Sequence, residues 1–227
     1  MTHLAPEAGR RPHRLLVINP NTNAQVTAQV RRAALAAAPR GTEIDVANPA
    51  RGPFAIESAR DRAEAVPHVV SLIEARMDEG FDGYVLACFD DIGVEEARRL
   101  VAVPVVSMFG AGVASARATG GRFAIITTVE SAVAGIERLA AAYGVAHLCT
   151  VRATGVGVAE TAARTPLAEA RLAAAIERAM VEDRAAAIVL GSGALTGRAA
   201  ALEERFGIPF IDGLAAAIVS PDNGPGP

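Results

Sequence analysis

The chain of 227 residues is 51% hydrophobic and 21% charged, which allows a large core in one domain or in two lobes. Its net charge of −3 and its aromatic content of 4% argue against nucleic acid and acidic membranes as partners. All 22 basic residues are arginine, so a lysine Schiff base with pyridoxal phosphate and a Walker-type phosphate loop are both excluded.

The ends of the chain and its two cysteines add further expectations. Residues 1–13 and 221–227 are polar or rich in Pro and Gly, and we expect them to be disordered tails. No apolar stretch reads as membrane-spanning, and the start lacks the apolar segment of a signal peptide, so a cytoplasmic protein is expected. Cys88 and Cys149 have neither the spacing of a disulfide framework nor that of a metal site, and no metal is predicted.

Short apolar runs alternate with helical patterns through the first half of the chain. Strands are predicted at 15–19, 43–47, 84–87 and 104–108, and helices at 24–38, 59–79, 93–100 and 110–117. Thr22 or Asn23 can cap the first of these helices, because both residue types satisfy free backbone N–H groups at a helix start. Pro67 is expected to start a helix or to bend one.

The same plan restarts in the second half. Strands are predicted there at 123–127, 147–152, 188–190 and 209–211, and helices at 131–143, 165–184 and 196–206. Each of these strands follows its counterpart in the first half at a nearly constant offset, which indicates an internal duplication. Short apolar strands that alternate with helices are typical of parallel sheets.

We therefore predict an α/β fold of two pseudo-symmetric lobes, each a four-stranded parallel sheet flanked by helices, with the active site in the cleft between them. The first lobe spans 14–110 and is completed by a C-terminal helix at 213–220, and the second spans 111–212. Ligands bind parallel sheets at the carboxyl ends of the strands. The polar side chains that follow strands at these ends are Asn19, Cys88, Thr127 and Ser192.

Cys88 and Ser192 occupy matching positions, 104 residues apart (192 − 88), in the two halves. A free cysteine has a pKa of about 8.5, which the predicted helix start near Gly93 would lower. Asp90 and Asp91 would oppose that effect, and we expect one of them to cap the helix. The Ser192 hydroxyl is a weak base that can hydrogen-bond a substrate oxygen or hold a water molecule. The structural alternatives are a small buried apolar cysteine and an ordinary Gly-Ser-Gly turn.

Two polar turns are candidate substrate-binding segments. Asn19, Asn21 and Thr22 lie in the run Asn-Pro-Asn-Thr-Asn, where amide groups and backbone N–H groups can hold a carboxylate or a ring carbonyl. Thr127 and Thr128 form the counterpart in the second half. The structural alternative for both segments is a turn with a helix cap.

Other chemically capable residues are given structural roles. His68, His147 and Cys149 have no partners at suitable spacing and are interpreted as structural, while Glu57 and Asp61 are expected at the surface or at an interface. No glycine run after a predicted strand has the dinucleotide-binding fingerprint, so a nicotinamide cofactor is not supported. Ser192 also lacks the flanking glycines of a nucleophile elbow, which argues against a serine hydrolase.

Six segments spread from about Arg14 to Val219 carry a family resemblance. They are Val17–Thr22, Gly52–Ser58, Ala87–Asp91, Ile126–Thr128, Val189–Gly193 and Pro209–Gly213. Together they resemble the Asp/Glu racemase superfamily and, within it, the hydantoin racemase group. The resemblance implies two pseudo-symmetric α/β lobes, no cofactor, and one cysteine from each lobe on either side of the substrate's stereocentre. By this resemblance Cys88 matches the first catalytic cysteine, whereas Ser192 stands where a second cysteine is usual.

These observations lead to three functional hypotheses. The first is a cofactor-independent racemase-like enzyme in which Cys88 acts as acid and base on a 5-substituted hydantoin, allantoin or an acidic amino acid. Asn19, Thr22, Thr128 and the turn of Ser192 and Gly193 would hold the substrate's oxygens. The second is a one-thiol decarboxylase, isomerase or lyase, because an alcohol does not exchange protons as readily as a thiol. The third is a retired enzyme that binds a small molecule. A homo-oligomer is expected in each case.

Overall fold

The computed structural model describes residues 13–219. Its strands form two four-stranded sheets in which all neighbouring strands are parallel. The first sheet has the order β2-β1-β3-β4 and contains β1 (His13–Ile18), β2 (Thr42–Ala47), β3 (Gly83–Leu86) and β4 (Val105–Ser107). The second has the corresponding order β6-β5-β7-β8 and contains β5 (Phe123–Thr127), β6 (Cys149–Ala153), β7 (Ala187–Leu190) and β8 (Phe210–Asp212). The matching strand orders confirm the predicted pair of four-stranded parallel α/β lobes.

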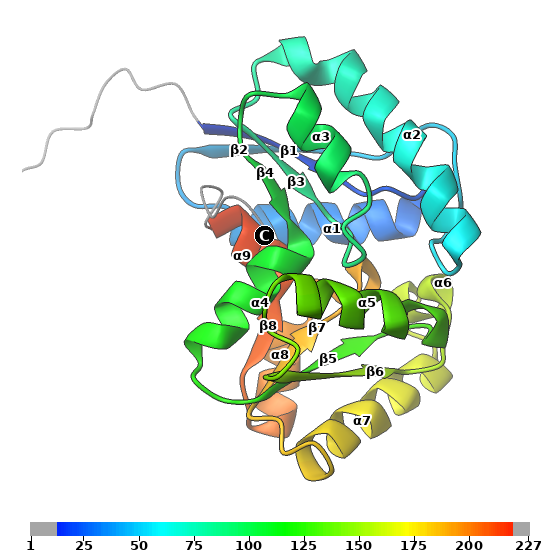
Figure 1. Ribbon diagram of the computed structural model, residues 1–227, viewed down its shortest axis with the longest axis vertical. Helices are drawn as coiled ribbons and strands as arrows, with labels where there is room; N and C mark the ends of the chain where they lie inside the picture. Colours follow the sequence, from blue (N-terminus) through cyan, green and yellow to red (C-terminus); the bar gives the residue numbers. More distant parts are fainter. Residues whose placement is uncertain (1–12, 220–227) are drawn as a thin grey trace, which may run out of the picture.

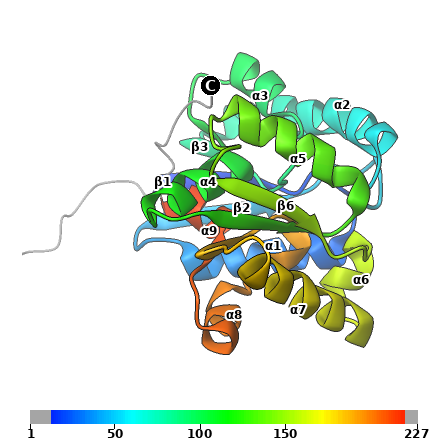
Figure 2. The same ribbon diagram turned by 60° about the horizontal axis from the view of Figure 1, so that its bottom comes forward.

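Helices cover both faces of each sheet (Figures 1 and 2). The outer helices are α2 (Ala59–Arg76) and α3 (Val94–Leu100) on the first sheet, and α7 (Pro166–Val181) and α8 (Ala199–Phe206) on the second. Between the two sheets lie α1 (Ala24–Ala37), α4 (Met108–Ala118), α5 (Glu130–Ala142) and α9 (Gly213–Val219). The shorter elements are α6 (Val158–Ala162) and the 3-10 helices η1 (Met77–Glu79) and η2 (Gly193–Leu195).

The central strands β1, β3, β5 and β7 contribute side chains to two cores. In β1, Leu15 and Val17 belong to the core between the sheets, while Leu16 and Ile18 belong to the core beneath the outer helices. Strands buried on both faces consist of continuous apolar residues, which is why the strand runs are visible in the sequence. The core between the sheets also contains Ile125 of the second sheet, so the two lobes share one apolar layer.

Two helix starts follow the predicted rules. The Asn23 side chain accepts hydrogen bonds from the backbone N–H groups of Gln25 and Val26 at the start of α1. Thr165 caps α7 in the same way, and Pro166 occupies the first turn, where its missing N–H costs no hydrogen bond. Both caps fix where a helix leaves the strand-end edge of a sheet.

Several predicted boundaries were wrong for local reasons. His147, predicted in a strand, lies in a turn closed by the N–H of Leu148 on the carbonyl of Val145, and β6 begins only at Cys149. The helix predicted from residue 196 begins at 199, after η2. The helix α6 was missed because five residues are too few to show a helical period. Pro67 lies inside α2 without ending it.

Two predictions dealt with the ends of the chain: the disordered tails and the C-terminal helix. Residues 1–12 and 221–227 lie outside the described residues, whereas His13, predicted in the first tail, opens β1. Helix α9 contacts α1, α4, β3 of the first sheet and β8 of the second, so that its assignment to the first lobe stays a prediction. No helix among residues 13–219 is long and apolar enough to cross a membrane.

A close helix contact predicts a stability effect. A β-carbon on Gly213 would overlap the backbone carbonyl oxygen of Met108, at the point where α9 meets α4. We therefore expect Gly213→Ala to lower the free energy of unfolding by about 2 kcal/mol or more, as overpacking of a tight contact does. Gly135→Ala is the matched control, because a β-carbon there meets its nearest neighbour, Arg138, at 3.9 Å. Denaturant unfolding that shows equal stability for the two variants would contradict this assignment.

Candidate active site

The carboxyl ends of both sheets open onto one cavity. The residues that line it are Asn19, Pro20, Asn21, Val26, Ile56, Ala87, Cys88, Phe89, Asp90, Thr127, Thr128, Val129, Ala132, Val158, Gly191, Ser192, Gly193 and Ala194. The space open to the centres of water molecules is about 40 Å³, room for about three waters at 10–15 Å³ each. The cavity is therefore narrow, and it brings Cys88 and Ser192 to a common space.

Two glycines shape the Ser192 turn, one against the Cys88 turn and one against β5. A β-carbon on Gly193 would lie 3.2 Å from the carbonyl oxygen of Ala87, the residue before Cys88. The turn that carries Ser192 thus packs directly against the turn that carries Cys88. On Gly191 a β-carbon would lie 2.9 Å from the carbonyl oxygen of Ile126, so this position admits no larger residue without movement of β5. Both glycines have a steric role, whatever contacts Gly193 makes with a substrate.

The Asn19 turn is held by its own side chains. Asn19 Nδ2 donates to Asn21 Oδ1 and to Thr27 Oγ1, both at 3.0 Å, and Asn21 Oδ1 also accepts from the backbone N–H of Asn23 at 3.0 Å. Asn19 and Asn21 are buried and line the cavity. Among residues 13–219 the Asn21 Nδ2 group has no hydrogen-bond partner, so it is the donor that the turn offers to a ligand.

The three threonines predicted to bind substrate differ in position. Thr127 and Thr128 line the cavity, and their hydroxyls make no hydrogen bond with any residue that the structure describes. Thr22 lies outside the cavity lining, and its N–H and hydroxyl both donate to the carbonyl of Pro53, at 3.0 and 3.3 Å. Thr22 thus holds the loop that precedes α2, whereas Thr127 and Thr128 present free hydroxyls.

The loop held by Thr22 closes one side of the cavity. Its Ile56 lines the cavity, and Glu57 Oε1 accepts a 2.7 Å hydrogen bond from the backbone N–H of Val158 in the second lobe. The Ser131 hydroxyl donates to the carbonyl of Glu57, also across the lobes. Glu57 therefore joins the lobes beside the cavity, as its expected interface position implies. The cavity contacts of Ile56 and Val158 were missed, because only the folded chain brings them to the strand ends.

The environment of Cys88 reverses one expectation. Burial, and after it the charge of Asp90, raise the pKa of the Cys88 thiol to about 12. The expected lowering by a helix N-terminus was wrong, because burial and the charge of Asp90 outweigh any effect of α3, whose first turn begins at Val94 and does not include Cys88. The thiol is therefore protonated at neutral pH in the empty site, and it is suited to donate a proton rather than to hold a resting negative charge.

The two aspartates after Cys88 do not cap α3. Asp90 Oδ2 accepts from Arg62 Nε at 3.0 Å, and burial raises the pKa of Asp90 against the effect of this arginine. Asp91 accepts hydrogen bonds from the Ser107 hydroxyl and, at 3.0 Å, from the Tyr143 hydroxyl of the second lobe. Burial raises the pKa of Asp91 to about 6. Asp90 lines the cavity, whereas Asp91 joins the lobes behind it.

The remaining chemical groups give no sign of a metal centre. Within residues 13–219, no three His, Cys, Asp or Glu side chains gather as a metal site requires. Cys149 lies in β6, away from the cavity lining, and burial raises its pKa to about 11. Among the cavity-lining residues, the groups able to exchange a proton are therefore the Cys88 thiol, the Asp90 carboxyl and the hydroxyls of Ser192, Thr127 and Thr128.

Known proteins resemble this chain in both sequence and fold. The Asp/Glu/Hydantoin racemase family model matches residues 15–220. A hydantoin racemase of Rhizobium meliloti is 37% identical over 203 residues, which cover 89% of this chain and 84% of the relative. The solved structure of an allantoin racemase from Klebsiella pneumoniae superimposes with a TM-score of 0.87 at 35% identity, over 92% of this chain and 86% of the other. An allantoin racemase from Pseudomonas fluorescens gives a TM-score of 0.87 at 31% identity, over 92% and 89%.

The raised thiol pKa predicts slow alkylation of Cys88. The rate of reaction with iodoacetamide should rise with pH up to at least pH 9, because only the thiolate reacts. Asp90→Asn removes the nearby negative charge, lowers the pKa of the Cys88 thiol and should raise the rate at pH 8 several-fold. Mass spectrometry of the Cys88 and Cys149 peptides separates the two thiols, and Cys149 serves as the internal control. A Cys88 rate that levels off below pH 8 would refute this view of the thiol.

Proposed function

The chain belongs to the Asp/Glu/Hydantoin racemase family, and we propose that it is a cofactor-independent isomerase that exchanges the proton of a carbon acid beside a carbonyl group. The observation that carries this proposal is the shared cavity, in which Cys88 and Ser192 follow equivalent strands of the two lobes. A thiol at one side of a narrow site and a hydroxyl at the other suit proton transfer at a carbon centre.

The charges of the cavity support a neutral substrate. Asp90 is the one charged side chain among the lining residues, and no arginine or histidine joins it. A free carboxylate in this cavity would lack a counter-charge, because Arg62 is already paired with Asp90. Of the three candidate substrates, this disfavours an acidic amino acid and favours a 5-substituted hydantoin or allantoin, the compounds named for the relatives.

The walls of the cavity provide for the substrate's carbonyl oxygens. The free hydroxyls of Thr127 and Thr128 and the Nδ2 group of Asn21 can donate hydrogen bonds to them. When the proton leaves carbon, negative charge moves onto the neighbouring carbonyl oxygen, and donors fixed in a dry site stabilise that enolate. The apolar side chains of Val26, Ile56 and Val158 leave room on the other walls for an uncharged substituent.

In the proposed reaction Cys88 exchanges a proton with the stereocentre on one face. With a pKa of about 12 in the empty site, its thiol can protonate an enolate, and the thiolate that remains can remove a proton in the reverse step. Ser192 faces the same cavity, but its oxygen already accepts a 3.3 Å hydrogen bond from the N–H of Ala194. An alcohol held in this way delivers protons to the opposite face more slowly than a thiol.

The hydroxyl of Ser192 also favours a second candidate function. A site with one thiol can protonate an enolate from a single face, which is the chemistry of a decarboxylase, isomerase or lyase with one acid–base group. Such an enzyme would form product without inverting a stereocentre. The two functions differ in whether proton exchange is accompanied by inversion, and the next two experiments measure both.

Proton exchange in deuterated water tests the role of Cys88. Incubation with one enantiomer of a 5-substituted hydantoin should place deuterium at the stereocentre, followed by NMR, faster than the uncatalysed reaction. Cys88→Ala should lower the catalysed rate at least about 100-fold, the typical contribution of a general acid–base group. Cys149→Ala is the matched control and should leave the rate unchanged. Exchange that survives in Cys88→Ala would remove the thiol from the mechanism.

The inversion rate tests the role of Ser192. We expect the wild-type protein to exchange the proton faster than it inverts the stereocentre, because only one face carries a thiol. Ser192→Cys supplies the second thiol and should raise inversion relative to exchange by about tenfold or more. Ser192→Ala should leave exchange nearly intact and slow inversion further. Optical rotation and deuterium content measured in the same sample give both rates, and equal ratios in all three proteins would rule out this role.

A further inference from the structure

We propose that Asp90 determines specificity by accepting a hydrogen bond from a substrate N–H group, so that the site selects a neutral ring or ureide with an N–H near the reacting carbon. This inference rests on the proposed function, and it assigns the polar group that recognises the substrate's nitrogen side.

Asp90 lines the cavity, and one of its two carboxylate oxygens is an unused hydrogen-bond acceptor. Its side chain is 11% exposed, and Oδ2 is occupied by Arg62 Nε at 3.0 Å. Oδ1 has no hydrogen-bond partner among residues 13–219 and lies toward α5, 4.0 Å from where a β-carbon of Gly135 would stand. A buried carboxylate can accept about four hydrogen bonds, so a single partner leaves acceptor capacity that a ligand can fill.

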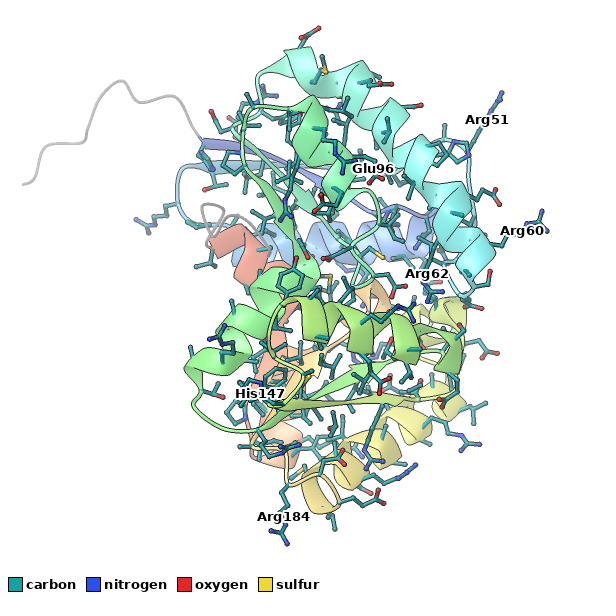
Figure 3. All side chains as sticks on the ribbon, in the orientation of Figure 1. Arg51, Arg60, Arg62, Glu96, His147 and Arg184 are labelled. Carbon is teal, nitrogen blue, oxygen red and sulfur yellow. The ribbon has the colours of Figure 1, made fainter. Side chains whose placement is uncertain are left out.

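The ion pair between Arg62 and Asp90 determines which type of hydrogen-bond donor a ligand can offer to the free oxygen of Asp90. The guanidinium of Arg62 balances the charge of Asp90, and its Nη2 group donates to the carbonyl of Ser131 in the second lobe at 3.4 Å. The labelled side chain of Arg62 in Figure 3 lies between α2 and the second lobe. A cationic ligand would leave this site with excess positive charge, and a carboxylate would leave it with excess negative charge. A neutral N–H group satisfies the free oxygen without either cost.

The two polar sides of the cavity then match the two sides of such a substrate. Asn21, Thr127 and Thr128 offer donors, which suit carbonyl oxygens, while Asp90 offers an acceptor, which suits N–H. Asp90 follows Cys88 by two residues on the same turn, so a ring held through its N–H lies beside the thiol. The N–H contact also reduces the negative field of Asp90 at Cys88, which favours the thiolate once the substrate is bound.

The test compares binding of a 5-substituted hydantoin with binding of its two N-methylated forms by calorimetry. In the wild-type protein, methylation of the recognised nitrogen should weaken binding about tenfold or more, because a hydrogen bond to a charged group is lost. In Asp90→Ala this ratio should fall close to one. Asp91→Asn, a change in the neighbouring carboxylate that does not line the cavity, should keep the wild-type ratio.

Several outcomes separate this inference from the proposed function. Should Asp90→Ala fail to fold, Asp90→Asn keeps the size of the side chain and should reduce the ratio at least threefold. An unchanged ratio in the folded Asp90 variant overturns the inference even if the wild-type protein catalyses deuterium exchange. A ratio that falls as expected, with no deuterium exchange on any substrate, supports the recognition role and overturns only the proposed function. Absence of binding by all three compounds overturns both.

Discussion

The apolar layer shared by the two sheets determines where the carboxyl ends of the strands, and with them the residues of the site, lie. Leu15 and Val17 from the first sheet and Ile125 and Val189 from the second belong to one buried core, together with helices α1, α4, α5 and α9. Because this layer packs the inner faces of both sheets against common helices, the carboxyl ends of the strands stay at one level. Gly193 then lets the two strand-end turns touch, while Gly191 packs against β5, so a duplicated backbone produces a single site.

The two lobes share one backbone arrangement, but their strand-end turns carry different side chains. On the first-lobe side, Cys88 lies beside a charged pair of Asp90 and Arg62, and burial keeps its thiol protonated. On the second-lobe side, Ser192 lies in a neutral turn and caps η2. A site with two equivalent thiols would treat the two faces of a substrate alike. In the proposed reaction this site treats them differently, and that asymmetry follows from the side chains that each turn carries rather than from its position.

The sequence predicted what depends on local patterns. The central strands β1, β3, β5 and β7 are largely apolar runs because both of their faces are buried, and the cap at Asn23 obeys a rule that involves neighbours within three residues. The pairing of Cys88 with Ser192 could be predicted because the repeat supplies long-range information. The direction of the Cys88 pKa shift could not, since it depends on burial by distant residues. Thr22 was predicted to hold substrate, but its Pro53 partner becomes adjacent only after folding.

The contacts around the cavity indicate which part of the structure must move for a ligand to enter. The space available in the cavity, about 40 Å³ for the centres of water molecules, is too narrow for a substituted ring, so some contact around it must yield. Separating the sheets would expose the shared apolar layer at roughly 25 cal/mol for each Å². Beside the cavity, by contrast, the loop of Ile56 and Glu57 is tied to the second lobe by two hydrogen bonds that Glu57 accepts, from the Val158 N–H and from the Ser131 hydroxyl. The bond to the Glu57 carbonyl contributes about 0.5–1.5 kcal/mol and the bond to its carboxylate about 1.5–3 kcal/mol, because water replaces both when they break. Release of this loop therefore enlarges the cavity at a lower cost in free energy than separation of the sheets.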